Sequence, residues 1–324
     1  MREPRFTFRR PQPAADPWAP LSWARGAIVV AVAAAPSVPA ANHLGVAGYA
    51  AGDAYAQVRD ALERVRRLLV DVGGRGVVVA DSNLAFDRAL ARRARLGWVG
   101  RHTLVMVPGY GGAVVLGSLI VDRVVEVRLG RTPTGDPCRN CRRCVDACPT
   151  GALGDGVLEP LRCRSWRQQE RHLEPSWRET WGPWLYGCDE CVTACPLSAR
   201  QKKVGGERVA SILSASDAAL AERVRSWYIP DRTLAWVRRN AIVAARSLAT
   251  SPDDEQAIWR QLVAGAAPVR AEAVRWVLRR GGWGGVDASR ARHQRLSPED
   301  RRYSALPRGD LPSARPDELR RRHA

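Results

Sequence analysis

The sequence has few acidic residues, no apolar run long enough to cross a membrane, and no clear export signal. It contains 33 Asp and Glu against 51 Lys and Arg in 324 residues, for a formal net charge of +18. The apolar run at residues 27–35 is far shorter than the about 20 residues of a membrane-spanning helix. Arg9 and Arg10 resemble a twin-arginine pair, but a long Pro-containing insert separates them from that run. We therefore expect a soluble, cytoplasmic protein without a membrane partner.

The excess of positive charge favours a polyanionic partner, and nucleic acid is the commonest soluble candidate. The alternative is a bias of composition, because nearly all of the basic residues are Arg and the chain is rich in Ala and Gly. Charge alone does not separate the two interpretations.

All eight cysteines lie between Cys138 and Cys195. The first run, CRNCRRCVDACP, has the spacing Cys-x2-Cys-x2-Cys-x3-Cys-Pro, which is typical of a bacterial four-iron cluster. The second run, YGCDECVTACP, lacks a leading cysteine and has Leu185 at that position. In two-cluster ferredoxins the fourth cysteine of each run binds the other cluster. The second set is then one ligand short, and Cys163 is the cysteine that remains to complete it.

This spacing predicts two 4Fe-4S clusters with four cysteine ligands each. The predicted first set is Cys138, Cys141, Cys144 and Cys195, and the second set is Cys148, Cys163, Cys188 and Cys191. A disulfide framework is typical of small secreted chains, and the layout does not match a zinc ribbon. Free thiolates also indicate a reducing compartment.

The rest of the pattern predicts three folded parts. Apolar strands at 27–35, 76–80, 103–107 and 113–121 alternate with helices at 57–72 and 84–95, as in an α/β domain. Short helices separated by prolines follow the cysteines and suggest a HEAT-like module. We expect an extended arm (1–25), an α/β domain (26–130), a ferredoxin-like two-cluster domain (131–204), an all-α HEAT-like module (205–280) and a disordered basic tail (281–324).

Asp81 directly follows the expected strand at 76–80, where α/β proteins place their sites. A carboxyl group that acts as an acid near neutral pH needs a raised pKa, which apolar neighbours such as Leu84 could provide. The alternative is that Asp81 caps the following helix. We expect Asp87, inside that helix, to be a solvated surface charge.

The order of these parts resembles the epoxyqueuosine reductase family, the iron–sulfur and cobalamin enzymes of tRNA queuosine synthesis. The cysteine pattern with the lone Cys163 and the segment YGCDECVTACP are its most discriminating features. The other matching segments are ADS (80–82), LGWVGRHTLVM (96–106), LGSLIVD (116–122), RCRSW (162–166) and LAWVRRNA (234–241). The resemblance covers about residues 26–280, and we expect the segment before the first strand to be shorter than in the family.

The resemblance implies that the epoxide of epoxyqueuosine in the tRNA anticodon loop is reduced to an alkene, with the clusters supplying electrons to cobalamin. It implies that Asp81 is the catalytic acid. The implied cobalamin contacts are Gly100, Arg101, His102, Thr103, Val105, Leu116, Ser165, Cys188 and Asp189. The implied tRNA contacts are Arg238, Arg239 and Asn240. We expect a monomer with an unidentified electron donor.

Two other functions fit part of the sequence. The chain could be a ferredoxin-like electron carrier whose α/β part is a docking module, or a corrinoid and iron–sulfur reductase of another substrate. No Asp-x-His-x-x-Gly loop for a lower cobalt ligand is present in the sequence. The cobalamin prediction therefore depends on the resemblance.

Overall fold

The structure is a computed structural model that describes residues 21–82, 84–125, 137–154, 156–198, 203–229 and 233–280. The expected basic tail and most of the expected arm lie outside these ranges, as does the expected boundary at 130/131. Among the helices of the described part, none is long and apolar enough to cross a membrane.

A three-stranded sheet forms the centre of the N-terminal part, in the order β1-β7-β4. Its strands are β1 (Gly26–Ala33), β7 (Val114–Val121) and β4 (Gly76–Val79), and β7 is antiparallel to both neighbours. These three strands confirm the predictions from the apolar runs.

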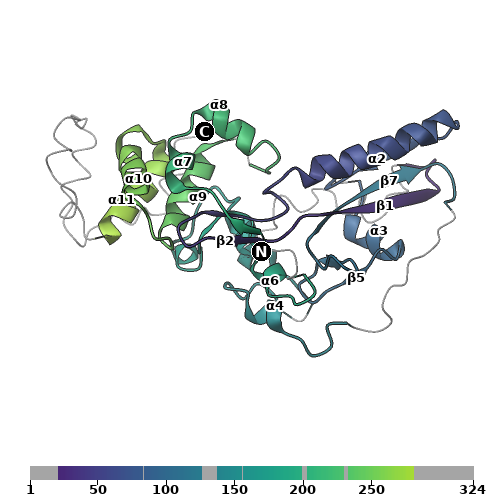
Figure 1. The fold of residues 1–324 in the computed structure, drawn as a ribbon, viewed down its shortest axis with the longest axis horizontal. Coiled ribbons are helices and arrows are strands. Elements are labelled where there is room, and N and C mark those ends of the chain that lie inside the picture. Colours follow the sequence, from purple (N-terminus) through teal and green to yellow (C-terminus); the bar gives the residue numbers. More distant parts are fainter. Residues whose placement is uncertain are drawn as a thin grey trace, which may run out of the picture.

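Two helices cover opposite faces of this sheet (Figure 1): α2 (Ala54–Asp71) and α3 (Asp87–Arg93). The cross-strand row Ile28, Leu119 and Val78 packs against α2, and the adjacent row, centred on Ile120, packs against Leu90 of α3. Both faces are thus apolar, which explains why the strands are continuous apolar runs instead of alternating patterns. A Cβ atom on Gly117 would lie 2.3 Å from Val58 Cγ1, so this glycine permits α2 to approach β7 closely.

The segment between β1 and α2 leaves the sheet and pairs with later parts of the chain. Strand β2 (Ser37–Pro39) is parallel to β9 (Lys203–Gly205), and β3 (Gly45–Val46) is parallel to β8 (Trp184–Tyr186). This connector joins the sheet to the cysteine-bearing region. The expected domain boundaries assign it to the α/β domain alone and do not predict its pairing with β8 and β9. Strands β5 (Trp98–Val99) and β6 (Val105–Met106) form a small antiparallel pair.

The cysteine-bearing region consists of short helical turns, as expected where clusters replace a hydrophobic core. Helices α4 (Arg143–Asp146) and α6 (Glu190–Thr193) contact each other, and each carries one cysteine of a Cys-x2-Cys pair. The other turns are η1 (Pro160–Arg162), α5 (Arg164–Arg167) and η2 (Pro175–Arg178).

The C-terminal part is helical and lies on the opposite side of the cysteine region from the sheet (Figure 1). Its helices are α7 (Val209–Leu213), α8 (Asp217–Arg223), α9 (Ala235–Ala245), α10 (Pro252–Ala264) and α11 (Ala267–Arg279). The expectation of short helices after the cysteines is confirmed. They share a core with Trp181, Leu185 and Tyr186 of the β8 region.

A buried ion pair joins η2 to α11. Arg178 Nη2 lies 2.6 Å from Glu272 Oε1, and both side chains are largely buried. Removing one partner of a buried ion pair leaves the other charge without compensation, which costs about 3–5 kcal/mol. We therefore expect Glu272→Ala to lower the midpoint of urea unfolding strongly under anaerobic conditions.

The exposed pair of Glu222 Oε1 and Arg225 Nη1, 3.0 Å apart, provides a matched control. Because exposed pairs contribute less than about 1 kcal/mol, Glu222→Ala should leave the midpoint nearly unchanged. Equal shifts in the two variants would show that the buried pair has no special role.

Candidate active site

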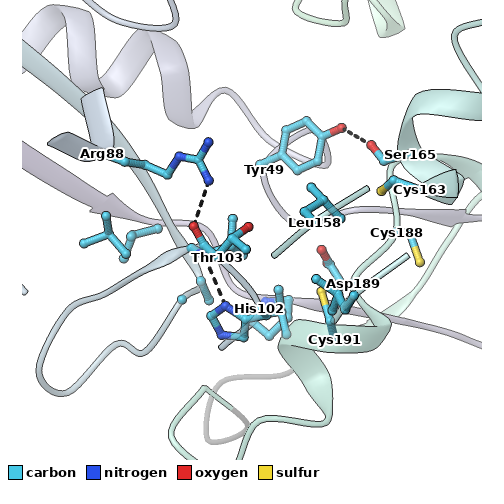
Figure 2. A pocket seen from close by; sticks show the side chains of 18 of the residues that line it. Tyr49, Arg88, His102, Thr103, Leu158, Cys163, Ser165, Cys188, Asp189 and Cys191 are labelled. Atoms are coloured by element: carbon cyan, nitrogen blue, oxygen red, sulfur yellow. Dashed lines mark hydrogen bonds between the residues drawn. The ribbon is translucent and has the colours of Figure 1, made fainter. Parts of the chain in front are cut away.

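A cavity of about 850 Å³ lies between the sheet and the cysteine-bearing region. Figure 2 shows Arg88, Thr103 and His102 on one side of it and Cys163, Cys188 and Cys191 on the other. Much of the wall is apolar, with Val105, Leu116, Leu153, Leu158 and Val192 among its residues. A large, mainly apolar cavity with a few polar groups is typical of a ligand or cofactor site.

Most of the residues that the sequence analysis selects meet at this cavity. Its lining includes Asp81 and, from the predicted cobalamin contacts, His102, Thr103, Val105, Leu116, Ser165, Cys188 and Asp189. Gly100 and Arg101 are not part of the lining. The Nη2 atom of Arg101 instead donates to the carbonyl oxygen of Arg139 at 2.5 Å.

Asp81 has a backbone conformation that is unusual for a residue with a side chain, with φ at 49°. It is not a helix cap, because α3 begins at Asp87 and its N-cap is Phe86. The carboxyl group is open to the cavity, but the surrounding protein raises its pKa by desolvation, against the opposing charge of Arg59. Asp81 thus has the position and the direction of pKa shift expected of an acid.

Asp87 is not the solvated surface charge that the sequence suggests. It lines the same cavity, and its Oδ2 atom accepts a hydrogen bond from the Asp81 N–H at 2.9 Å. Its Oδ1 atom is buried without a hydrogen-bond partner in the described part of the chain. Burial raises the pKa of Asp87 to about 6, although the hydrogen bond from Asp81 opposes the shift. This carboxylate holds the backbone of Asp81.

Two tyrosines border the cavity near these carboxyl groups. The Tyr49 hydroxyl lies 3.4 Å from Ser165 Oγ (Figure 2) and connects the connector to the RCRSW segment. Burial raises the pKa of Tyr49 and Tyr55 well above the usual value, so both hydroxyl groups stay protonated at neutral pH. Tyr49 could not be predicted as a site residue, because its only signal is its position in a Gly- and Ala-rich segment.

Asp189 lies between the two parts that enclose the cavity. Its buried Oδ2 atom accepts hydrogen bonds from the backbone N–H groups of Ser37 and Gly48, each at 2.7 Å. Burial raises its pKa to about 6, and the two hydrogen bonds oppose that shift. The side chain therefore fixes the connector to the turn between Cys188 and Cys191.

His102 is buried, and its Nδ1 atom accepts a hydrogen bond from the Leu104 N–H at 3.2 Å. Desolvation lowers its pKa to about 4, so the ring is neutral near pH 7.

The two predicted cysteine sets differ in their position relative to the cavity. All four members of the second set, Cys148, Cys163, Cys188 and Cys191, line the cavity, whereas no member of the first set does. The pKa of Cys191 is raised by burial and by the nearby Cys188, Cys163 and Cys148. The pKa of Cys144 is raised by burial and then by Cys195 and Cys138. The thiols thus influence one another within each set.

The donor chemistry fits clusters better than single ions. In the ranges that the structure describes, no three His, Cys, Asp or Glu side chains are arranged to hold one metal ion. The four cysteines of a 4Fe-4S cluster bind different iron atoms, so they need not converge on one point. The Ala152 N–H donates to Cys148 Sγ at 3.3 Å, and the buried Arg164 donates through Nη1 to Cys188 Sγ at 3.4 Å.

The prediction that Arg239 and Asn240 contact tRNA is wrong. Their exposed fractions are 2% and 3%. Arg239 Nη1 donates to the carbonyl oxygens of Glu170 and Arg171, and Asn240 Nδ2 donates to that of Gln168 at 2.9 Å. Burial lowers the pKa of Arg239 to about 10. These two side chains hold α9 against the cysteine region.

Arg238 is also engaged within the helical part. Its Nη1 atom lies 2.7 Å from Asp217 Oδ1, and its Nη2 atom donates to the Ala215 carbonyl oxygen at 2.8 Å. The three residues therefore do not form the basic face that the sequence suggests.

Comparison with known proteins agrees with this arrangement. A family model of a 4Fe-4S double cluster binding domain matches residues 137–198. An epoxyqueuosine reductase of Listeria monocytogenes is 40% identical over 122 residues, which are 37% of this chain and 31% of that relative. The chain therefore matches about a third of the length of that relative.

Two solved structures are similar over most of the chain. A crystal structure of selenomethionine-labelled epoxyqueuosine reductase is 25% identical, with a TM-score of 0.73 over 84% of this chain and 78% of that one. A structure of epoxyqueuosine reductase with a tRNA-Tyr epoxyqueuosine-modified stem loop is 22% identical, with a TM-score of 0.72 over 92% and 84%. The second likeness concerns the fold alone. The double-cluster motif, the sequence relatives and the fold are thus all similar to those of epoxyqueuosine reductases.

Proposed function

We propose that this chain is an oxidoreductase that converts epoxyqueuosine to queuosine in tRNA. The observation that carries the proposal is the cavity, which has Asp81 on one wall and the second cysteine set on the other. A proton donor and an electron source thus face the same space. The names of the sequence relatives and the stem loop in one similar structure support the choice of substrate.

The proposed reaction requires both a proton donor and an electron source. Loss of the epoxide oxygen as water, with formation of a carbon–carbon double bond, consumes two electrons and two protons. We assign one 4Fe-4S cluster to each cysteine set, so that electrons enter one at a time. Arg164, buried beside Cys188, places a positive charge next to the second cluster and helps to balance its negative thiolates.

The residues around the cavity also fit cobalamin. The space of about 850 Å³ is near the upper end of small-molecule cavities, and its apolar wall suits a large flat ring. We propose that Thr103, Val105, Leu116 and Ser165 hold this cofactor. Cobalamin would supply a metal centre that becomes a nucleophile toward the epoxide carbon when it is reduced. Protein side chains do not provide such a redox-active nucleophile.

Asp81 is the proposed acid. Its carboxyl group would protonate the epoxide oxygen as the C–O bond breaks, and the resulting carboxylate would be reprotonated from solvent. Proton transfer from a positioned side chain requires hydrogen-bond reach as well as a suitable pKa. Asp87 is the proposed positioning residue, because its carboxylate fixes the Asp81 backbone in the conformation with φ at 49°.

Exposed arginines at the cavity are the proposed contacts for tRNA phosphates, in place of the residues on α9. Arg88 and Arg92 line the cavity and are exposed, and Arg88 Nη1 is oriented by the Thr103 carbonyl oxygen at 2.8 Å. Arg and Lys contacts to phosphate provide most of the affinity for nucleic acid and make it depend on salt.

The remaining predictions about organisation stay proposals. We retain the ferredoxin-like domain over residues 131–204 and the HEAT-like module over 205–280. We also retain a monomer in a reducing compartment, which thiolate ligands require.

The assignment of Cys163 can be tested by iron content. If Cys163 is the fourth ligand of the second cluster, Cys163→Ala should lower the iron content of the anaerobically reconstituted chain from about eight to about four atoms. Ser165→Ala, two residues away, should keep the full content. Retention of about eight irons by Cys163→Ala would contradict the assignment.

The role of Asp81 can be tested by turnover. With cobalamin and a reductant, the wild-type chain should convert epoxyqueuosine in tRNA to queuosine, detected by mass spectrometry of the digested tRNA. Asp81→Asn should lower turnover by about 10²–10⁴-fold and leave iron content and tRNA affinity unchanged, because it removes only proton donation. Asp60→Asn on the solvent side of α2 makes the same charge change and should retain activity. Full activity of Asp81→Asn would exclude Asp81 as the acid.

The role of Asp87 can be tested with two substitutions. Asp87→Ala removes the acceptor of the Asp81 N–H and should lower kcat about tenfold, as expected for one lost hydrogen bond of about 1.4 kcal/mol. Asp87→Asn keeps an acceptor oxygen and should restore kcat to within about threefold of wild type. If both variants lose the same activity, the negative charge matters and the hydrogen bond does not.

A further inference from the structure

The two cysteine sets differ in their access to solvent. Cys141 of the first set is exposed, and so are its neighbours Arg139, Arg142 and Arg143. All members of the second set line the cavity, and no member of the first set does. The first set is therefore the one that a reductant outside the molecule can approach.

We propose that the loop of residues 138–143, together with Leu197 and Tyr110, is the docking surface for an acidic one-electron carrier protein. The proposal rests on the proposed function, in which two clusters deliver electrons to the cavity. It assigns the first cluster as the point of entry and the second as the donor to the reaction.

The charge of this surface fits an acidic partner. Arg139, Arg142 and Arg143 lie on it, and the nearby Oδ1 atom of Asp146 is 3.9 Å from Arg142 Nε. That pair is exposed and offsets little of the positive potential. Arg139 and Arg143 form no ion pair with any residue that the structure describes. Complementary charge of this kind accelerates the encounter of two proteins, and the acceleration decreases with salt.

Two exposed apolar side chains lie close to Cys195, a ligand of the first set. Leu197 follows the first-set ligand Cys195 and is 47% exposed, and Tyr110 is 49% exposed. The turn that carries Tyr110 contacts the Leu197 backbone, since a Cβ on Gly111 would lie 2.7 Å from the Leu197 carbonyl oxygen. A small apolar area with charged surroundings is typical of the weak, transient contacts of electron-transfer proteins.

The position of the loop favours a protein over tRNA as its partner. The modified nucleotide must enter the cavity to reach Asp81, and neither the loop of residues 138–143 nor Leu197 or Tyr110 is part of the cavity lining. A carrier on the first set can therefore deliver electrons while tRNA occupies the cavity. A shared surface would make the two partners exclude each other.

The test compares two charge-reversed variants of the full chain with both clusters. Arg139→Glu with Arg143→Glu changes the docking surface, and Arg64→Glu with Arg67→Glu makes the same change of net charge on α2. The probe is a reduced, acidic plant-type ferredoxin, and stopped-flow absorbance measures how fast the clusters are reduced. Reduced methyl viologen, a small cation, serves as the second reductant.

At low salt we expect the docking variant to react with the ferredoxin about tenfold more slowly than wild type, because charge reversal chiefly lowers the association rate. The α2 variant should stay within about twofold, and the difference should vanish at high salt. Reduction by methyl viologen should be unchanged in both variants.

Three results would overturn the proposal. Equal slowing of both variants would indicate net charge alone, and slower reduction by methyl viologen would indicate that the arginines support the cluster itself. A loss of tRNA affinity in the docking variant, with an unchanged ferredoxin rate, would assign the surface to RNA. If wild type accepts electrons from the ferredoxin but does not convert epoxyqueuosine, the proposed function fails and the docking surface stands.

Discussion

The carboxylate of Asp189 is the contact on which the arrangement of the site depends. It is buried between the two main parts of the molecule, and its two acceptor bonds hold Ser37 and Gly48 of the connector. A buried carboxylate is costly unless hydrogen bonds compensate it, so this conformation of the connector is strongly preferred. Because the connector carries Tyr49 and leads into α2, the same contact sets the distance between the sheet and the second cysteine set. Asp189 itself is part of the cavity lining, so this contact lies directly at the site.

The different exposure of the two cysteine sets gives the molecule a direction for electrons. The second set is partly buried and lines the cavity, and burial raises the pKa of Cys188 to about 12. A buried cluster must be compensated by nearby donors and cations, and Arg164 and the Ala152 N–H provide both at short range. The first set has an exposed loop instead, where positive side chains are solvated. In the proposed relay, the exposed loop at Cys141 receives electrons from an external reductant, and the second set at the cavity passes them on.

Much of this organisation could be predicted because it depends on local patterns. The strands β1, β4 and β7 are buried on both faces, so each is a continuous apolar run that can be read without knowing its partners. The connector could not be read in this way, because strands of two or three residues carry too few positions for a period. Its parallel pairing with β8 and β9 depends on residues more than a hundred positions away.

The wrong predictions for Asp87, Arg239 and Asn240 have one physical cause. A polar residue interrupts the apolar pattern of a helix in the same way whether it faces a cavity or bulk water. The pattern therefore predicted a surface charge at Asp87. Arg239 and Asn240 show the reverse case, because α9 is covered on nearly all sides and its polar residues satisfy backbone carbonyl groups of the cysteine region. Helical periodicity reports which positions are apolar, and it cannot report what surrounds the polar ones.

In the proposed role of Asp81 as the acid, its environment would link proton delivery to the presence of a substrate. In the free protein its carboxyl group reaches water through the cavity, and the charge of Arg59 opposes the effect of desolvation on its pKa. Filling the cavity displaces that water, which raises the pKa of a carboxyl group further. A phosphate near Arg59 would also offset the positive charge that favours the ionised form. Both effects favour a protonated Asp81 when the cavity is filled, so under the proposed function the bound substrate would prepare the acid that protonates it.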